Sequence, residues 1–144
     1  MESSDLTFTS LEEIEALHQA FVNGEIALRD FHHREHLAVA FFICLQNDKA
    51  KAITRINEGL NKYLSRYGRQ TEFHATMTGF RVVTVWQYLA SNTSKALLEQ
   101  ANDILRRFGN TGLIKQFYSR ELLNSDAARE DFLLPDLQPL SALL

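Results

Sequence analysis

An unbroken apolar run, Leu37 to Leu45, lies in a stretch of chain that contains neither proline nor glycine. On a helix from about His32 to Gln46, such a run places apolar side chains on nearly every side, so the helix must be covered by protein all round. The window from Phe73 to Leu89 is broadly apolar in the same way. These two windows predict buried helices at the centre of the fold, around which the remaining segments pack.

Capping side chains and terminating glycines divide the rest of the chain into further helical windows. Ser10 and Glu13 have the spacing of a capping box at the start of the first window. No window shows the strict alternation of apolar and polar residues that is typical of strands. The sequence therefore predicts an all-α fold, a helical bundle of about five main helices. The expected caps of the first, third, fourth and fifth helices are Ser10, Asp48, Thr71 and Ser94, and the glycines expected to end the first, third and fifth are Gly24, Gly68 and Gly109.

The length of 144 residues fits a single domain that spans residues 1–144. The two prolines, Pro135 and Pro139, lie near the end of the chain. We expect short helices after residue 112, followed by a tail over residues 133–144 that lies extended on the bundle. Residues 1–8 are expected to be disordered.

Composition argues against several kinds of partner. The net charge is −3, and no patch of Lys and Arg interleaves with aromatic residues, so no nucleic acid is expected. The run from Leu37 to Leu45 is too short to span a bilayer, so no membrane partner is expected. The N-terminus lacks the features of a secretory signal, and the single cysteine, Cys44, allows no intrachain disulfide. These features favour a cytoplasmic protein. They do not indicate its oligomeric state, and a small-molecule ligand is expected only from the histidine cluster described below.

Five histidines occur in the chain, and three of them crowd into residues 32–36 at the start of the second helix. His74 stands at the start of the fourth helix. Short turns join the second, third and fourth helices, so we expect the second and fourth to run parallel. Their N-terminal ends would then meet, and the histidines would converge there. A helix N-terminus disfavours imidazolium, so these rings should be neutral near pH 7.

Helical spacing selects three of the histidines for a shared site. His33 and His36 lie on the face that Leu37 carries into the core, which leaves His32 outward. Together with His74 they would surround one cavity, either as catalytic acid–base groups or as ligands of zinc or a non-haem iron. Two other possibilities stay open, a pocket without metal and a purely structural histidine network. The carboxylates that could complete or orient a metal site are Asp30, Glu35 and Glu72.

Polar side chains near the histidines are candidates for substrate binding. Thr78 and Arg81 follow His74 on one stripe of the fourth helix. A cationic Arg81 would repel a bare metal ion but would hold an anionic substrate. Tyr118 and Arg120 lie in the region of short helices, where segments often close over pockets. We expect them at the mouth of the cavity; the alternative is that both lie at the rim without contacting a ligand.

The combined pattern His-x-x-His and His-x-Thr-x-Thr lies within segments 31–40 and 73–78, and segments 117–129 and 135–140 accompany it. Together these segments resemble a family of small all-α bacterial proteins of uncharacterised function. The resemblance covers most of the chain past residue 30, and it implies His33, His36 and His74 as the site residues. Members of the family tend to carry Glu where this chain has Ala75. If that Glu serves chemistry, the resemblance implies altered activity here.

The resulting hypothesis is a small cytoplasmic enzyme that acts on a small anionic molecule through His33, His36 and His74, with or without a metal. The alternative is a non-catalytic ligand-binding or protein-interaction module with a structural histidine network. The two classes differ in one consequence. Replacing His74 with Ala should abolish turnover in an enzyme that keeps its fold, whereas it should lower the melting temperature of a structural network.

Overall fold

The computed structural model describes residues 7–109 and 112–143. This part of the chain is helical and contains no strand, which confirms the all-α prediction. None of its helices is long and apolar enough to cross a membrane. The helices are α1 (Leu11–Asn23), α2 (His33–Gln46), α3 (Lys49–Arg66), α4 (Ala75–Ser91), α5 (Leu97–Phe108), α6 (Arg120–Leu123) and α7 (Asp126–Glu130).

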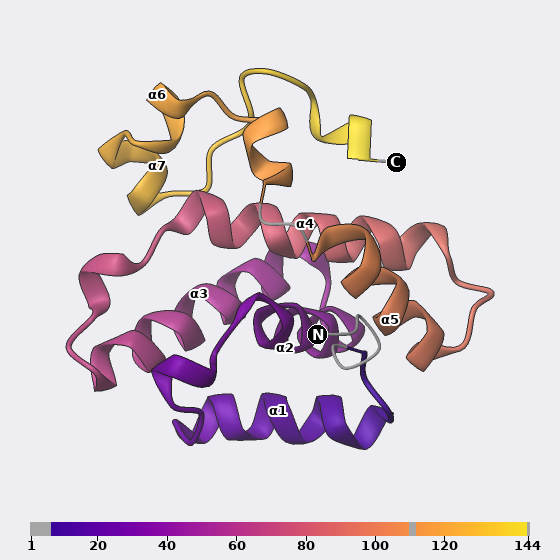
Figure 1. The fold of residues 1–144 in the computed structure, drawn as a ribbon. Coiled ribbons are helices and arrows are strands. Elements are labelled where there is room, and N and C mark those ends of the chain that lie inside the picture. The colour runs from indigo at the N-terminus through magenta and orange to yellow at the C-terminus, as the bar shows by residue number, and fades with distance from the viewer. Residues whose placement is uncertain (1–6, 110–111, 144) are drawn as a thin grey trace.

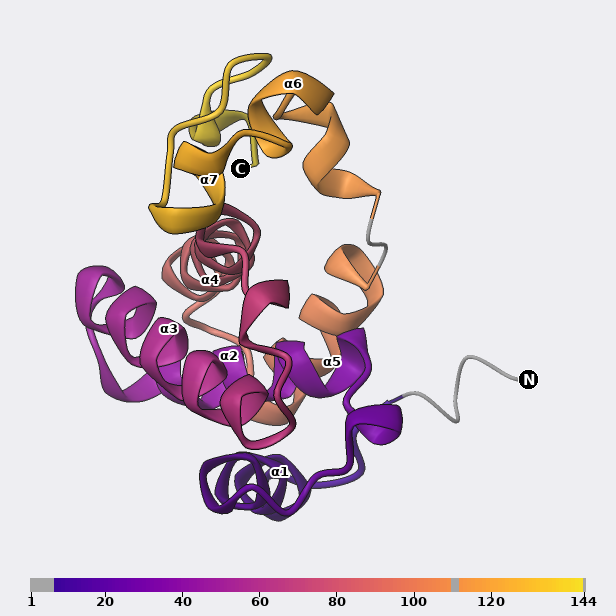
Figure 2. The ribbon, with the colours of Figure 1, turned by 90° about the vertical axis from the view of Figure 1, so that its left-hand side faces the viewer.

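Helix α2 lies at the centre of the main body, with α1, α3, α4 and α5 around it (Figure 1, Figure 2). Its buried side chains follow one another without a gap from Leu37 to Phe41, and Ile43 and Cys44 continue the series. Successive residues point to different sides of a helix, so every side of α2 is in contact with protein. The unbroken apolar run of the sequence thus accounts for the central position of this helix.

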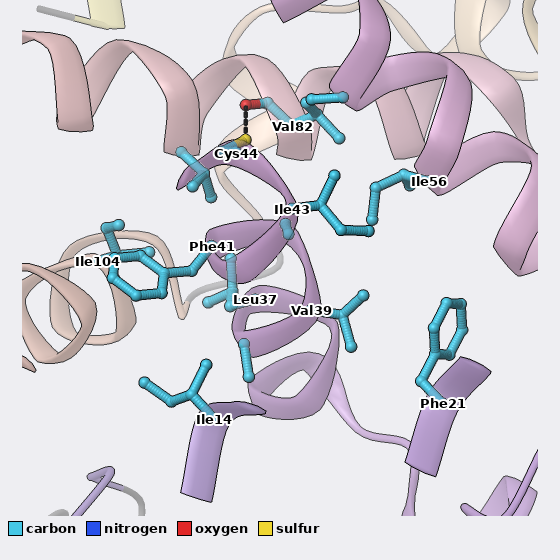
Figure 3. Close-up of a cluster of buried hydrophobic side chains, with 14 of the residues drawn as sticks. Ile14, Phe21, Leu37, Val39, Phe41, Ile43, Cys44, Ile56, Val82 and Ile104 are labelled. Carbon is cyan, nitrogen blue, oxygen red and sulfur yellow. Dashed lines mark hydrogen bonds between the residues drawn. The ribbon is translucent and has the colours of Figure 1, made fainter. Parts of the chain in front are cut away.

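Figure 3 shows how the surrounding helices close on α2. Apolar side chains reach it from α1, α3 and α5, namely Phe21, Ile56 and Ile104. Towards α4, the thiol of Cys44 donates to the carbonyl oxygen of Val82 at 3.9 Å. Burial raises the pKa of Cys44 to about 12, so the thiol stays protonated and behaves as a small apolar side chain.

Helices α2 and α4 cross each other, so the predicted parallel arrangement is wrong. In Figure 1, α2 is seen nearly end-on while α4 runs across the view, and in Figure 2 it is α4 that is seen end-on. A short link such as residues 47–48 makes two helices neighbours, but the ridges and grooves of side chains decide the angle at which helices pack. A helix that is apolar on every side offers no single seam along which parallel neighbours would align.

The C-terminal residues 112–143 form a layer on the outer side of α4 (Figure 1). Thr76 ties this layer to the start of α4, because its hydroxyl donates to the carbonyl of Asp131 at 2.7 Å. The same oxygen accepts from the backbone N–H of Leu133 at 3.0 Å. Gly79 lets the ring of Phe132 lie directly on the helix, since a Cβ at this position would overlap the ring. The start of the tail is therefore fixed to the bundle.

Several helix ends agree with the capping residues that the sequence predicts. The side chain of Ser10 accepts from the backbone N–H of Glu13 at the start of α1. Asp48 accepts from the backbone N–H of Lys51 at the start of α3. Gly24 ends α1 in the left-handed conformation, with φ 73°. These ends are determined by contacts within a few residues, which a sequence pattern can report.

Two other helices begin later than predicted. Residues 70–72 form a separate 3₁₀ turn, so Thr71 does not cap α4, and His74 takes the N-cap position instead. Helix α5 begins after Ala96 and not after Ser94. In both cases the chain makes an additional turn before the helix, which delays its first residue.

The two ends of the chain also depart from the sequence-based expectation. Residues 1–6 lie outside the described residues, but Phe8, which was expected to be disordered, is only 4% exposed. Its backbone N–H donates to the side-chain oxygen of Asn102 at 2.8 Å. Burial of the ring against the core offsets the entropy cost of ordering this residue. At the other end the tail is not extended throughout, because residues 140–143 form a 3₁₀ turn.

Candidate functional site

His33 lies in the first turn of α2, facing the end of α5. The turn is fixed by a capping box, in which the backbone N–H of His32 donates to the carboxylate of Glu35 at 2.9 Å. The Nε2 atom of His33 lies 2.8 Å from the carbonyl oxygen of Phe108. A carbonyl only accepts, so Nε2 carries the ring proton and Nδ1 is an acceptor. Burial lowers the pKa of His33, and the charge of Arg81 lowers it further, although the hydrogen bond to Phe108 raises it.

His36 follows one turn later on α2, between Phe31 and Arg81. The rings of Phe31 and His36 stack with their centroids 4.0 Å apart. The Nη1 atom of Arg81 lies 3.3 Å from Nδ1 of His36. Because a guanidinium has only donors, Nδ1 of His36 accepts this hydrogen bond and Nε2 carries the proton. Burial, and then the nearby charge of Arg81, hold the pKa of His36 well below its ordinary value, so the ring is neutral at pH 7.

Arg81 on α4 is a cation without a carboxylate partner. Its Nε atom is buried and has no hydrogen-bond partner. Within residues 7–109 and 112–143, no Asp or Glu oxygen pairs with its guanidinium, and the neutral His36 is the one side chain that bonds it. Burial lowers the pKa of Arg81 to about 10, so the side chain still carries its charge at pH 7. The site thus holds a partly buried positive charge that no carboxylate of the described residues neutralises.

Arg81 contributes to the walls of two cavities. The larger one, of about 100 Å³, lies between α2, α4 and the chain around the end of α5. The smaller one, of about 10 Å³, lies on the side of α3 and includes His36 and Thr78 in its lining. The structure therefore brings His33, His36 and Thr78 together around the guanidinium of Arg81. The larger cavity is lined by His33, Leu37, Met77, Phe80, Arg81, Thr84, Phe108, Leu113 and Ile114.

His74 does not join this group, and the expectation of three imidazoles around one cavity needs correction. As the N-cap of α4, His74 accepts at Nδ1 from the backbone N–H of Met77, at 3.1 Å. Its Nε2 donates to the carbonyl oxygen of Leu123 at 2.7 Å. Both ring nitrogens are therefore engaged with the backbone, and His74 as a whole is only 8% exposed. His74 joins α4 to the C-terminal layer, which is a structural task.

The histidines also fail to supply the ligand set that zinc or a non-haem iron would need. In the described part of the chain, no group of three or more His, Cys, Asp or Glu side chains is placed to hold a metal ion. Glu35 bonds the backbone of His32 and the guanidinium of Arg34. Glu72 pairs with Arg69 at the surface. A metal at this site would moreover face the positive charge of Arg81.

Tyr118 and Arg120, expected at the mouth of the cavity, lie elsewhere. Tyr118 is 1% exposed and packs edge-on against Phe80, with the ring centroids 5.7 Å apart. Its hydroxyl donates to the carbonyl oxygen of Leu133 at 2.6 Å, so it is not available to a ligand. Arg120 is exposed and lines a surface groove with Tyr118 and Lys115. Neither residue lines the cavities that contain Arg81.

No sequence pattern indicated the residues that bring the far side of the cavity close to α2. Phe108, at the end of α5, receives the hydrogen bond of His33 through its backbone oxygen. Leu113 and Ile114, in the following 3₁₀ turn, line the cavity with apolar surface. These contacts join segments about 75 residues apart in sequence. No local spacing carries a signal for them, and a backbone acceptor has no residue preference at all.

Comparisons of the chain with family models, with curated proteins and with solved structures give no match. The class that the structure itself defines is an all-α domain with a partly buried arginine, which has no carboxylate partner among the described residues, beside a largely apolar cavity. The resemblance to the family with the His-x-x-His and His-x-Thr-x-Thr pattern stays a prediction. Ala75, where that family tends to carry Glu, is 1% exposed, so a carboxylate at this position of the chain would need an internal partner.

Proposed function

We propose that this protein binds a small anionic molecule in the cavity beside Arg81. The observation that carries the proposal is the guanidinium itself, which has a buried Nε without a partner and no carboxylate beside it in the described residues. Arginine has five N–H donors in a planar fork, and this fork matches the oxygens of a carboxylate or phosphate. The neighbouring cavity of about 100 Å³ gives a ligand room to reach it.

Charge balance supports an anion more than any other ligand. An ion taken out of water costs several kcal/mol unless a partner of opposite charge compensates it. His36 provides one neutral acceptor at 3.3 Å, which is too little to offset that cost. A bound anion would supply the missing charge together with charge-assisted hydrogen bonds. The unliganded protein would then be the less stable of the two states.

Catalysis is a second candidate function, and the position of His33 favours it. It lines the same cavity as Arg81, and its unprotonated Nδ1 can accept a proton from a bound molecule. We therefore infer an enzyme that uses Arg81 to hold the anion and His33 as a base, with His36 positioning Arg81 through its Nδ1. The non-catalytic alternative is a binding module in which both histidines only shape the cavity. His74 has no part in either version beyond holding the fold.

Thermal-shift and calorimetric titrations with sodium phosphate, sulfate and short carboxylates test anion binding. We expect at least one of these anions to raise the melting temperature of the wild-type protein in a saturable way. Arg81→Met should abolish that response, and Arg81→Lys should weaken it because an ammonium lacks the planar fork. Arg120→Met removes the same charge from an exposed position and serves as the matched control. Equal responses in Arg81→Met and the wild type would contradict the proposal.

A second variant separates the enzyme from the binding module. In His33→Gln, the amide nitrogen can take the place of Nε2 and keep the hydrogen bond to Phe108, but no basic nitrogen remains. Both versions predict that this variant still binds the anion. Calorimetry in two buffers of different ionisation enthalpy then measures proton uptake on binding. Uptake by the wild type that is missing in His33→Gln supports a base at His33, and equal uptake in both would exclude that role.

A further inference from the structure

The chemistry of the cavity wall narrows the ligand class beyond an unspecified anion. Apart from Arg81, the polar side chains of the lining are those of His33 and Thr84. The ring proton of His33 is used at Phe108, and the hydroxyl of Thr84 donates to the backbone oxygen of Arg81 at 2.8 Å. The guanidinium is therefore the one group of this described lining that offers free N–H donors. With those donors in use, the side chains of His33 and Thr84 can only accept from a ligand.

This donor arrangement suits an anion with one charge and two oxygens. A single guanidinium binds one carboxylate in a bidentate manner, which satisfies both oxygens and balances the charge. A phosphate dianion would keep an uncompensated charge and a third oxygen among acceptors and apolar atoms. Burying such a group without partners is costly. The described part of the lining thus discriminates against phosphate and sulfate, because it contains no second cationic side chain and no further free side-chain donor.

The rest of the ligand must be apolar and short. Six of the lining side chains are apolar, namely Leu37, Met77, Phe80, Phe108, Leu113 and Ile114. A cavity of about 150 Å³ lined by such side chains holds benzene, so the room here, about 100 Å³, corresponds to about four carbon atoms. A chain of that size would contact apolar side chains while its head group reaches Arg81.

We propose that the ligand is a short-chain monocarboxylate, with an unbranched or singly branched apolar chain of about three to five carbons including the carboxyl carbon. The carboxylate pairs with Arg81, and the chain lies against Phe80, Leu113 and Ile114. This inference rests on the proposed anion site, because it assigns the ligand class of that same site.

A chain-length series tests the ligand class on the wild-type protein. Titration calorimetry with sodium acetate, propionate, butyrate, valerate, hexanoate and octanoate should show affinity rising about fourfold for each added methylene up to butyrate or valerate. Affinity should stop rising for the longer acids, whose ends no longer fit. Inorganic phosphate and butylamine should bind at least tenfold more weakly than butyrate. Arg81→Met should lose butyrate binding.

A change of cavity size provides the structural control. Leu113→Ala enlarges the cavity, so the best chain length should increase by one or two carbons. Leu134→Ala removes the same atoms from a residue that is 71% exposed and should leave the series unchanged. If Leu113→Ala does not fold, the wild-type series alone still decides the question.

The possible outcomes separate this inference from the anion site itself. Binding of phosphate as tight as that of butyrate, lost in Arg81→Met, would leave the anion site standing and overturn the carboxylate class. Carboxylate affinities that do not depend on chain length would also leave the anion site standing, and they would overturn the assignment of an apolar chain. If no anion binds in a manner that depends on Arg81, both the inference and the proposed function fail.

Discussion

Replacing Arg81 with Met should stabilise the unliganded protein, even though it removes the proposed ligand contact. Met has a similar length and is apolar, so it can occupy the enclosed path of the arginine side chain without a charge. Well-packed apolar side chains in place of buried charged groups typically stabilise a protein by about 1–4 kcal/mol. Loss of the hydrogen bond to His36 offsets about 1 kcal/mol of this gain. The remaining gain is about 0–3 kcal/mol, and we expect about 1–2 kcal/mol in the free energy of unfolding, the middle of that range.

This gain in the free energy of unfolding corresponds to a rise in melting temperature, which differential scanning calorimetry can measure. With an unfolding entropy of about 2.1 cal/mol/K per residue, a chain of 144 residues gives about 0.3 kcal/mol/K. Each kcal/mol then corresponds to about 3 °C, so Arg81→Met should melt about 3–6 °C above the wild type in buffer without small carboxylates. A ligand that binds only the wild type would reduce or reverse this difference.

Arg34→Met is the matched control, with the opposite expected sign. Arg34 is also largely enclosed, but its guanidinium bonds Glu13 at 2.7 Å and Glu35 at 3.2 Å. Its removal leaves carboxylates without their partner and should cost about 2 kcal/mol, or about 6 °C. If Arg81→Met destabilises the protein as much as Arg34→Met does, Arg81 is compensated within the fold, and the reasoning from an unpaired charge is refuted.

Three further predictions concern the histidines and the C-terminal layer. His74→Ala should lower the melting temperature by about 6 °C, because the helix cap and a buried hydrogen bond are lost. His74→Asn keeps the cap, so its melting temperature should fall by about half as much. Both variants should still bind the anion. Because the pKa of His36 lies well below its ordinary value of 6.5, the unfolded chain binds more protons, so stability is full above pH 6.5 and falls at lower pH. In urea titrations, the free energy of unfolding of His36→Gln should fall less steeply below pH 6.5 than that of the wild type. An equally steep fall would contradict the assignment of this pH dependence to His36. Gly79→Ala should destabilise the protein despite the better helix propensity of Ala, and Phe132→Ala should relieve this cost; a Gly79→Ala effect that is independent of Phe132 would show that the overlap is not its cause.

The helices were predictable because their signals are local. Unbroken apolar residues from Leu37 to Leu45 are enough to place α2 in the core, and Ser10 and Asp48 cap the helices that follow them. The crossing of α2 and α4 was not predictable in the same way. It depends on how side chains of several helices fit together, and spacing within one helix does not contain that information.

The candidate site could be predicted only in part for a related reason. Helical spacing puts Thr78 and Arg81 on one stripe, and the structure does place both beside His36. His74 shares that stripe in the sequence, but α4 begins one residue after it, so its ring turns to the backbone of Met77 and Leu123. An N-cap is outside the helical periodicity, and a shift of a few residues in the start of a helix changed its role from site to cap.

The resonance of the Arg81 Nε–H group in a ¹⁵N-correlated NMR spectrum tests the central claim most directly. The signal is assigned by its disappearance in Arg81→Met, and the Nε–H signal of Arg34 serves as the internal reference. Addition of sodium butyrate should move the Arg81 signal in a saturable way and leave that of Arg34 in place. An Arg81 signal that stays unmoved by butyrate and by phosphate, at concentrations where both salts are in large excess, would show that no anion reaches this guanidinium and would contradict the account.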